Sequence, residues 1–257
     1  FGFYFYFFIT FVIFLLIEGI YSAYYYKVSA ITDYLQFESK SSINPYVWNE
    51  NGLVEIIQSI ILFFSAIFIF RFIYIFKLNS KNHFFEIFLY LYFFGLIYYF
   101  FEEISWGQHF FFWDSPDFFI KANNQNETNF HNISNFFNEL PRSLLLIWCS
   151  FSFLIFKVIK KNKKLFLFKN FIFPNSNLKK ISYLLLFFTI PDLFVDKFNL
   201  HPGYPIDWIT AIRLYEIIDF ITFNYIRLSE LQELIIDYYI LSHAFYLIKN
   251  DKLFNKS

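Results

Sequence analysis

Residues 84–109 read FFEIFLYLYFFGLIYYFFEEISWGQH, a long apolar run that ends at two adjacent carboxylates, Glu102 and Glu103. The apolar part approaches the roughly 20 residues that an α-helix needs to cross a bilayer. The polar stretch that follows culminates in NNQNETNFHN, residues 123–132. We therefore expect hydrophobic helices arranged around a polar site at one membrane boundary.

Composition places the whole chain in the membrane class. Of its 257 residues, 57% are hydrophobic and only 16% are charged, which is outside the range of ordinary soluble domains. The formal net charge is zero, which argues against a nucleic-acid partner. The single cysteine, Cys149, permits no internal disulfide and no cysteine-based metal site. Because the sequence contains no Met, we expect that residues precede Phe1.

The apolar runs predict an all-α, polytopic integral membrane helix bundle that forms one domain over residues 1–257. The bundle would have about six transmembrane helices, at residues 3–26, 52–76, 84–103, 142–160, 181–196 and 230–249.

Residues 206–227 are apolar but include Arg213, Glu216 and Asp219. A charge at mid-membrane depth costs about 2.5–3.5 kcal/mol on insertion scales. We therefore predict a surface or re-entrant helix there, with a seventh span as the alternative.

The distribution of basic residues predicts the orientation of the bundle. Lys and Arg accumulate on the cytoplasmic side of membrane proteins. The linker 157–180 holds eight lysines and no acid, and further basic residues at 71–81 and 249–256 fall on the same side of a six-span topology. Both termini are thus predicted to be cytoplasmic, and the loop 104–141 to face outward.

This topology brings the polar residues of the spans to the outer side of the membrane. Such residues are costly in lipid, so they usually face a bundle interior and mark function. We therefore predict an outward polar pocket. The candidates in the spans are Glu18, Glu55, Gln58, Glu102, Glu103, Asp192, Glu230, Glu233 and Asp237. The candidates in the loop that would cover the pocket are Trp106, Gln108, His109, Glu127, Asn129, His131 and Asn132.

Three chemistries are compatible with such a pocket. His131 and Glu102 could bind a divalent metal, with Glu102, Glu103 and His131 as candidate catalytic residues for hydrolysis. Crowded carboxylates could instead hold a proton beside a charged base. The loop amides and Trp106 could also bind a sugar or lipid head group.

Structural roles compete with each functional interpretation. Acids at span ends often mark the headgroup boundary, and Trp106 and Trp113 are suited to the aromatic belt at the membrane interface. The sequence has no phosphate-binding glycine loop, no His-Glu-x-x-His and no Gly-x-Ser-x-Gly motif. Nucleotide-driven transport, zincin-type proteolysis and serine hydrolysis are therefore disfavoured.

Three motifs resemble a family of uncharacterised bacterial multi-spanning membrane proteins. They are ENGLVE at residues 50–55, EEISWGQ at 102–108 and NQNETNFHN at 124–132, the last fitting the pattern N-Q-x-E-T-N-x-H-N. The chain has His109 where the resemblance implies Arg. The resemblance covers the second to fourth predicted spans and implies a location in the bacterial inner membrane, but it implies no activity.

Three functional hypotheses follow, all with the lipid bilayer as a partner. The first is a membrane protein that binds a polar head group or an ion in the outward pocket. The second is a metal-dependent hydrolase or transferase that acts on a lipid or lipid-linked substrate. The third is a scaffold subunit of an envelope complex.

Overall fold

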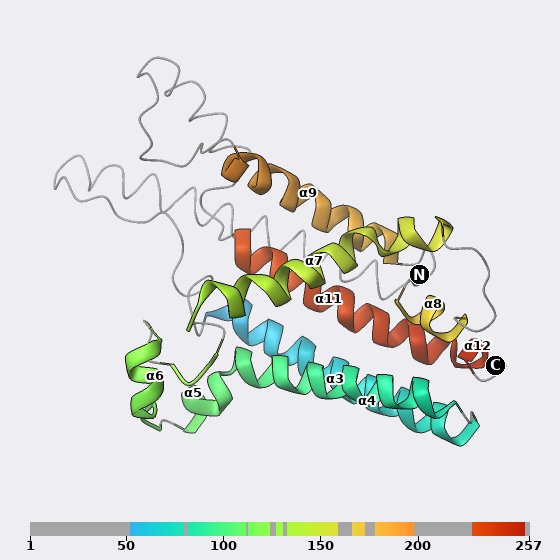
Figure 1. Ribbon diagram of the computed structural model, residues 1–257, viewed down its shortest axis with the longest axis horizontal. Coiled ribbons are helices and arrows are strands. Elements are labelled where there is room, and N and C mark those ends of the chain that lie inside the picture. Colours follow the sequence, from blue (N-terminus) through green and yellow to red (C-terminus); the bar gives the residue numbers. More distant parts are fainter. Residues whose placement is uncertain are drawn as a thin grey trace, which may run out of the picture.

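The computed structural model describes residues 52–79, 82–111, 113–123, 127–130, 133–158, 166–172, 178–197 and 228–254. Every regular element in these ranges is a helix (Figure 1), so the expected all-α class is confirmed there. The predicted span 3–26 with Glu18, the segment 206–227, and the residues His131 and Asn132 lie outside the described residues.

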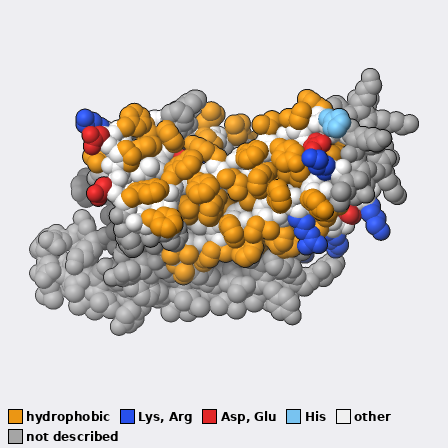
Figure 2. Space-filling model, turned by 90° about the horizontal axis from the view of Figure 1, so that it is seen from below, with side chains coloured by type: hydrophobic (Ala, Val, Ile, Leu, Met, Phe, Trp, Pro, Cys, Tyr) orange, Lys and Arg blue, Asp and Glu red, His pale blue; other side chains and the backbone are white. Residues whose placement is uncertain are grey.

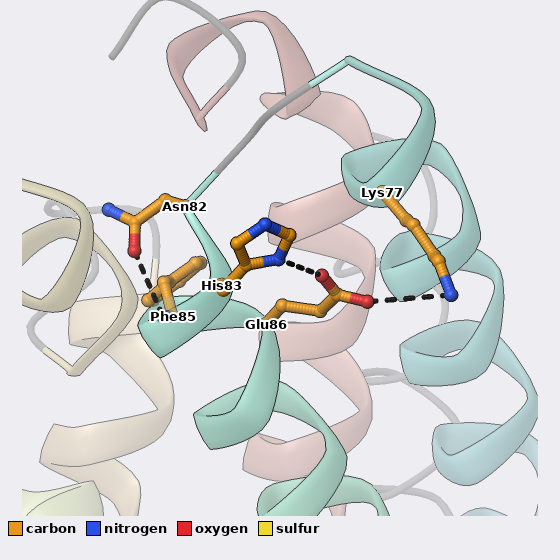
Figure 3. A network of polar contacts seen from close by, with 5 residues as sticks. All are labelled: Lys77, Asn82, His83, Phe85 and Glu86. Carbon is orange, nitrogen blue, oxygen red and sulfur yellow. Dashed lines mark hydrogen bonds and ion pairs between the residues drawn. The ribbon is translucent and has the colours of Figure 1, made fainter.

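The first two described helices, α3 (Leu53–Asn79) and α4 (His83–Glu103), form a hairpin. They match the predicted spans 52–76 and 84–103, and both are long and apolar enough to cross a membrane. Polar contacts hold the turn between them (Figure 3). Glu86 lies 3.6 Å from the Lys77 ammonium and 3.5 Å from the His83 ring, and the Asn82 side chain accepts a hydrogen bond from the Phe85 N–H.

Three further long helices lie alongside this hairpin (Figure 1). They are α7 (Asn135–Val158), α9 (Lys179–Lys197) and α11 (Leu228–Lys249). The last two occupy the predicted ranges 181–196 and 230–249 as helices, although among the described helices only α3 and α4 are both long and apolar enough to cross a membrane. α7 begins well before the expected residue 142, so Pro141 lies inside the helix rather than at its start. The apolar spacing of Phe136, Phe137 and Leu140 extends the helical pattern upstream of the proline.

Short helices occupy the two ends of the bundle (Figure 1). At what we call the loop end lie η1 (Ser105–Gly107), α5 (Gln108–Phe111) and α6 (Asp117–Ala122). At the opposite end, which we call the hairpin end, lie α8 (Phe166–Ile172) and α12 (Asp251–Phe254). α8 falls within the lysine-rich stretch that the sequence suggested was only a linker.

α11 is the central helix of the described bundle. It packs against α3, α9 and α7, and every residue from Leu234 to Ala244 is buried. A helix that is buried on all sides is normally apolar throughout. α11 instead carries four ionisable residues, Glu230, Glu233, Asp237 and His243.

The outer face of the hairpin is apolar between two charged ends. Figure 2 shows hydrophobic side chains across the middle of this face, with charged side chains gathered toward its two ends. The large exposed apolar residues of α3 and α4 include Phe63, Phe70, Tyr74, Phe84, Leu91, Phe94 and Tyr98.

Candidate functional site

The loop that follows α4 starts with an unusual backbone turn. Ser105 and Trp106 have φ angles of 45° and 55°, in the left-handed region that L-residues rarely adopt, and Gly107 has a φ of 87°. The turn is closed by the Gly107 N–H, which donates to the Ile104 carbonyl at 2.8 Å. Non-glycine residues in such conformations cost about 1–3 kcal/mol each and persist where surrounding contacts hold them.

Glu102 supplies two of those contacts. Its carboxylate is buried, with one oxygen accepting a hydrogen bond from the Trp106 indole N–H at 2.8 Å. The other oxygen accepts from the backbone N–H of Phe130 at 2.7 Å. A carboxylate that bridges two N–H donors makes strong, charge-assisted bonds. Glu102 therefore ties the end of α4 to both the turn and the distant part of the loop.

A second carboxylate, Glu127, organises the interior of the loop. It accepts hydrogen bonds from the Ser105 hydroxyl at 2.9 Å and from the Asn129 amide at 2.8 Å. The Asn123 amide donates to the Glu127 carbonyl and to the Asn129 side-chain oxygen, both at 2.8 Å. All four side chains are buried, so these bonds satisfy groups that have lost contact with water.

Gln108 completes what we call the loop network, comprising Glu102, Ser105, Gln108, Asn123, Glu127 and Asn129. Its side-chain oxygen accepts from the Thr128 N–H at 2.7 Å and from the Ser115 hydroxyl at 3.1 Å. The polar groups predicted to bind a head group thus bond to one another. Their observed contacts stabilise the loop, and a ligand-binding role for Trp106, Gln108, Glu127 and Asn129 stays a prediction.

A second polar group lies between the helices at the loop end. Glu103 interacts electrostatically with Glu233 and Asp237, and also with Glu230 and Glu55. We call these five residues, which come from α3, α4 and α11, the carboxylate cluster. The helix spacing explains the grouping, because Glu230, Glu233 and Asp237 follow one another at intervals of three and four residues on one face of α11.

Asp237 is the most enclosed member of the carboxylate cluster. Its side chain is fully buried, and within the described part of the chain neither oxygen meets a donor at good hydrogen-bond geometry. The Tyr99 hydroxyl faces the carboxylate closely enough to interact with it. Glu233 and Glu230 are its acidic neighbours on α11. A buried carboxylate surrounded by other acids is costly unless a proton or a cation compensates its charge.

An arginine of α7 and two side-chain amides, one from α3 and one from α11, lie at the rim of the cluster. The Arg142 guanidinium of α7 lies 3.4 Å from a Glu233 oxygen and donates to the Gln232 side chain at 2.9 Å. The Gln58 amide of α3 donates to the Glu230 carbonyl at 3.3 Å. These contacts join α3, α7 and α11 around the acids.

The structure thus separates the sequence-predicted residues into two groups. Glu55, Gln58, Glu103, Glu230 and Glu233 come together at the carboxylate cluster, whereas Glu102 belongs to the loop network. The separation follows from helix geometry, because successive residues point about 100° apart. Asp192 lies within α9, at a position whose side chain is outside the described set.

A metal site has no support among the described side chains. Within ranges 52–79, 82–111 and the later described segments, no three His, Cys, Asp or Glu side chains are placed to share an ion. Both oxygens of Glu102 already accept hydrogen bonds. The predicted metal pair of Glu102 and His131 depends on a histidine outside the described residues and stays a prediction.

The sequence analysis did not identify three residues that border the carboxylate cluster. Tyr99 precedes Glu103 by four residues and so shares its helix face, a signal that could have identified it. Arg142 and Gln232 could not be placed, because Arg142 was expected at the very start of a span. In the structure it lies one and a half to two turns inside α7.

Comparison with known proteins adds no relative. No protein-family model, curated protein or solved structure matches this chain.

Proposed function

We propose that this chain is a multi-spanning membrane protein that binds a cation at the carboxylate cluster. The observation that carries the proposal is the convergence of acids from α3, α4 and α11 around the fully buried Asp237. Ionised carboxylates at this spacing repel one another, and the repulsion strengthens as water is excluded. A positive charge among Glu103, Glu233 and Asp237 would relieve it.

Helix length and surface support the membrane setting. The helices beside the hairpin, α7, α9 and α11, have 24, 19 and 22 residues. At 1.5 Å per residue they extend roughly 28–36 Å, against a hydrocarbon core of about 30 Å. Only 17% of the most apolar 18-residue stretch of α4 is buried within the protein. A lipid environment accounts for that exposed aromatic surface better than the core of a soluble domain does.

Charge asymmetry supports the proposed orientation. Lys77, Lys179, Lys249 and Lys252 lie at the ends of their helices nearest the hairpin end. By the positive-inside tendency, the hairpin end would be cytoplasmic and the carboxylate cluster would lie toward the outer side. The proposed location is the bacterial inner membrane.

Two cations suit the chemistry of the cluster: a proton and the quaternary ammonium of a lipid head group. A ligand that binds the folded state raises the unfolding midpoint. The experiment therefore measures the thermal unfolding midpoint of the detergent-purified protein in one series that varies the pH and one that varies the choline chloride concentration, with a NaCl series as the control for ionic strength. The series in which the wild-type midpoint responds identifies the ligand.

The test variant is the double substitution Glu233→Gln with Asp237→Asn, which removes charge and keeps side-chain shape. Its matched control is Glu86→Gln, which removes a carboxylate of α4 at the opposite end of the bundle. We expect the midpoint to respond to at least one cation in the wild type and the control, and at least tenfold more cation to be needed in the double variant. An equal response in all three proteins, or a wild type that responds to none, would show that the cluster is not a cation site.

A further inference from the structure

The exposed side of α3 is a continuous stripe that changes character toward the hairpin end. Its members recur mostly every three or four residues, as expected for one face of a helix. Arg71 and Lys77 belong to this stripe and are exposed. Its other members are apolar: Leu53, Ile56, Ile60, Phe63, Phe64, Ile67, Phe70 and Tyr74. The stripe is therefore apolar along most of α3 and gains two cations near the end of the helix.

The position of Arg71 along α3 matches the level at which acyl chains meet head groups. About 20 helical residues cross the hydrocarbon core of a bilayer, and about 20 residues counted from Leu53 end at Phe72. Arg71 therefore lies near the boundary of the core, and Lys77 lies about 9 Å farther along the helix axis. Tyr74 lies between them and is exposed, and tyrosine is enriched at this level of membrane proteins.

The charge of Arg71 is not compensated within the described part of the chain. The ion pairs there involve Lys77, His83 and Arg142 but not Arg71. Ionisable residues in membrane segments are costly, and they usually face the bundle interior or pair with another group. Arg71 is instead exposed on the apolar face of the hairpin, so its counterion would come from outside the described residues.

Other lysines add positive charge at the hairpin end. Lys77 lies 3.6 Å from Glu86, yet its side chain remains 62% exposed (Figure 3). α12 packs against α3 and carries Lys252, and Lys249 ends α11 next to it in sequence. Both lysines are exposed. Clusters of Lys and Arg at the cytoplasmic ends of spans attract anionic lipids.

We propose that Arg71, Tyr74 and Lys77 bind the phosphate of an anionic phospholipid in the leaflet at the hairpin end. A guanidinium donates two parallel hydrogen bonds to phosphate oxygens, whereas an ammonium acts as a point charge. The Tyr74 hydroxyl would supply a further donor. The acyl chains would lie along the apolar members of the stripe.

The surroundings of the two cations favour a phospholipid over a free phosphate. Arg71 follows directly on Phe70, and the apolar stripe continues from there toward the loop end. Figure 2 shows Lys and Arg side chains beside hydrophobic ones at an end of this face. A free anion would use only the cations, whereas a phospholipid would also cover the apolar surface. The inference takes only the membrane setting from the proposed function, because the carboxylate cluster lies at the opposite end of the bundle.

The test measures the thermal unfolding midpoint of the full chain in detergent micelles that contain increasing amounts of dioleoylphosphatidylglycerol. A ligand that binds the folded state raises this midpoint. Parallel series with dioleoylphosphatidylcholine and with inorganic phosphate, all at one ionic strength, distinguish an anionic lipid from a zwitterionic lipid and from a free anion.

The test variants are Arg71→Gln and Lys77→Gln, which remove exposed cations from α3. The matched control is Lys121→Gln, which removes an exposed cation from α6 at the loop end. We expect phosphatidylglycerol alone to raise the midpoint of the wild type and the control. Arg71→Gln should need at least tenfold more of this lipid for the same rise. Lys77→Gln should need at least threefold more, because Glu86 already offsets part of the Lys77 charge.

Three outcomes would overturn the inference: a wild type that does not respond to phosphatidylglycerol, an Arg71→Gln variant that responds as the wild type does, or an equal response to phosphatidylcholine or inorganic phosphate. The midpoint of each variant without added lipid shows that the fold is retained. Arg71→Gln should also keep the wild-type response to pH or choline. A wild type that responds to one of those cations but not to phosphatidylglycerol would refute the lipid site and leave the proposed function standing.

Discussion

Glu102 and Glu103 are neighbours in sequence and have opposite surroundings. Glu102 meets two N–H donors, from Trp106 and Phe130, at 2.8 Å and 2.7 Å. Glu103 meets other acids, chiefly Glu233 and Asp237. One carboxylate is matched by groups that favour its charge, and the other is placed where its charge is opposed.

The same difference divides the other polar residues of this chain into two groups. The loop network is a set of donors and acceptors that satisfy one another, and it holds a strained turn at Ser105 and Trp106. The carboxylate cluster gathers acids around Asp237, which is fully buried and whose oxygens meet no donor at good hydrogen-bond geometry among the described residues. Satisfied networks rigidify a fold, whereas crowded, buried like charges are typical of sites that bind a cation or move protons.

The largest effect is expected from Glu102→Ala. The substitution leaves the Trp106 indole and the Phe130 amide without their acceptor, and two charge-assisted bonds of this kind are together worth about 3 kcal/mol or more. We expect a large drop in the thermal unfolding midpoint, together with faster proteolysis of the loop. Glu86→Ala is the control, since its contacts with Lys77 and His83 involve exposed partners and are worth about 1 kcal/mol at most. Equal losses in the two variants would contradict a special role for Glu102.

A smaller loss is expected from Gly107→Ala, which tests the turn without removing any hydrogen bond. The φ angle of 87° disfavours any side chain, and an added Cβ would lie 3.1 Å from an edge carbon of the Phe111 ring. The cost should be about 1–2 kcal/mol in unfolding free energy. Gly95→Ala is the matched control, since that helical position has open space around it. It should be neutral or slightly stabilising, and a loss at Gly95 equal to that at Gly107 would show that the turn is not strained.

The sequence predicted the placement of the carboxylate cluster better than the contacts within the loop. Intervals of three and four residues on α11, with the short link between α3 and α4, were enough to bring Gln58, Glu103, Glu230 and Glu233 to one end. The left-handed turn at Ser105 and Trp106 could not be predicted, because local propensity opposes it and tertiary contacts, among them those of Glu102 and Glu127, hold it. The sequence also grouped Glu102 with Glu103, since spacing alone does not show which neighbour turns toward a loop.

The smallest effect is expected from Glu103→Gln. Measured beside Glu102→Gln, it most directly tests the contrast between the surroundings of the two carboxylates. Both substitutions keep side-chain shape and remove one negative charge. At position 102, the new amide group faces an N–H donor, so we expect a loss of about 2 kcal/mol in unfolding free energy. At position 103, the substitution removes repulsion from Glu233 and Asp237, so stability should be unchanged or higher by up to about 1 kcal/mol. Denaturant or thermal unfolding in the same detergent measures both. A loss at Glu103 as large as that at Glu102 would mean that its charge is compensated within the folded protein, and the carboxylate cluster would then be a satisfied structural network like the loop.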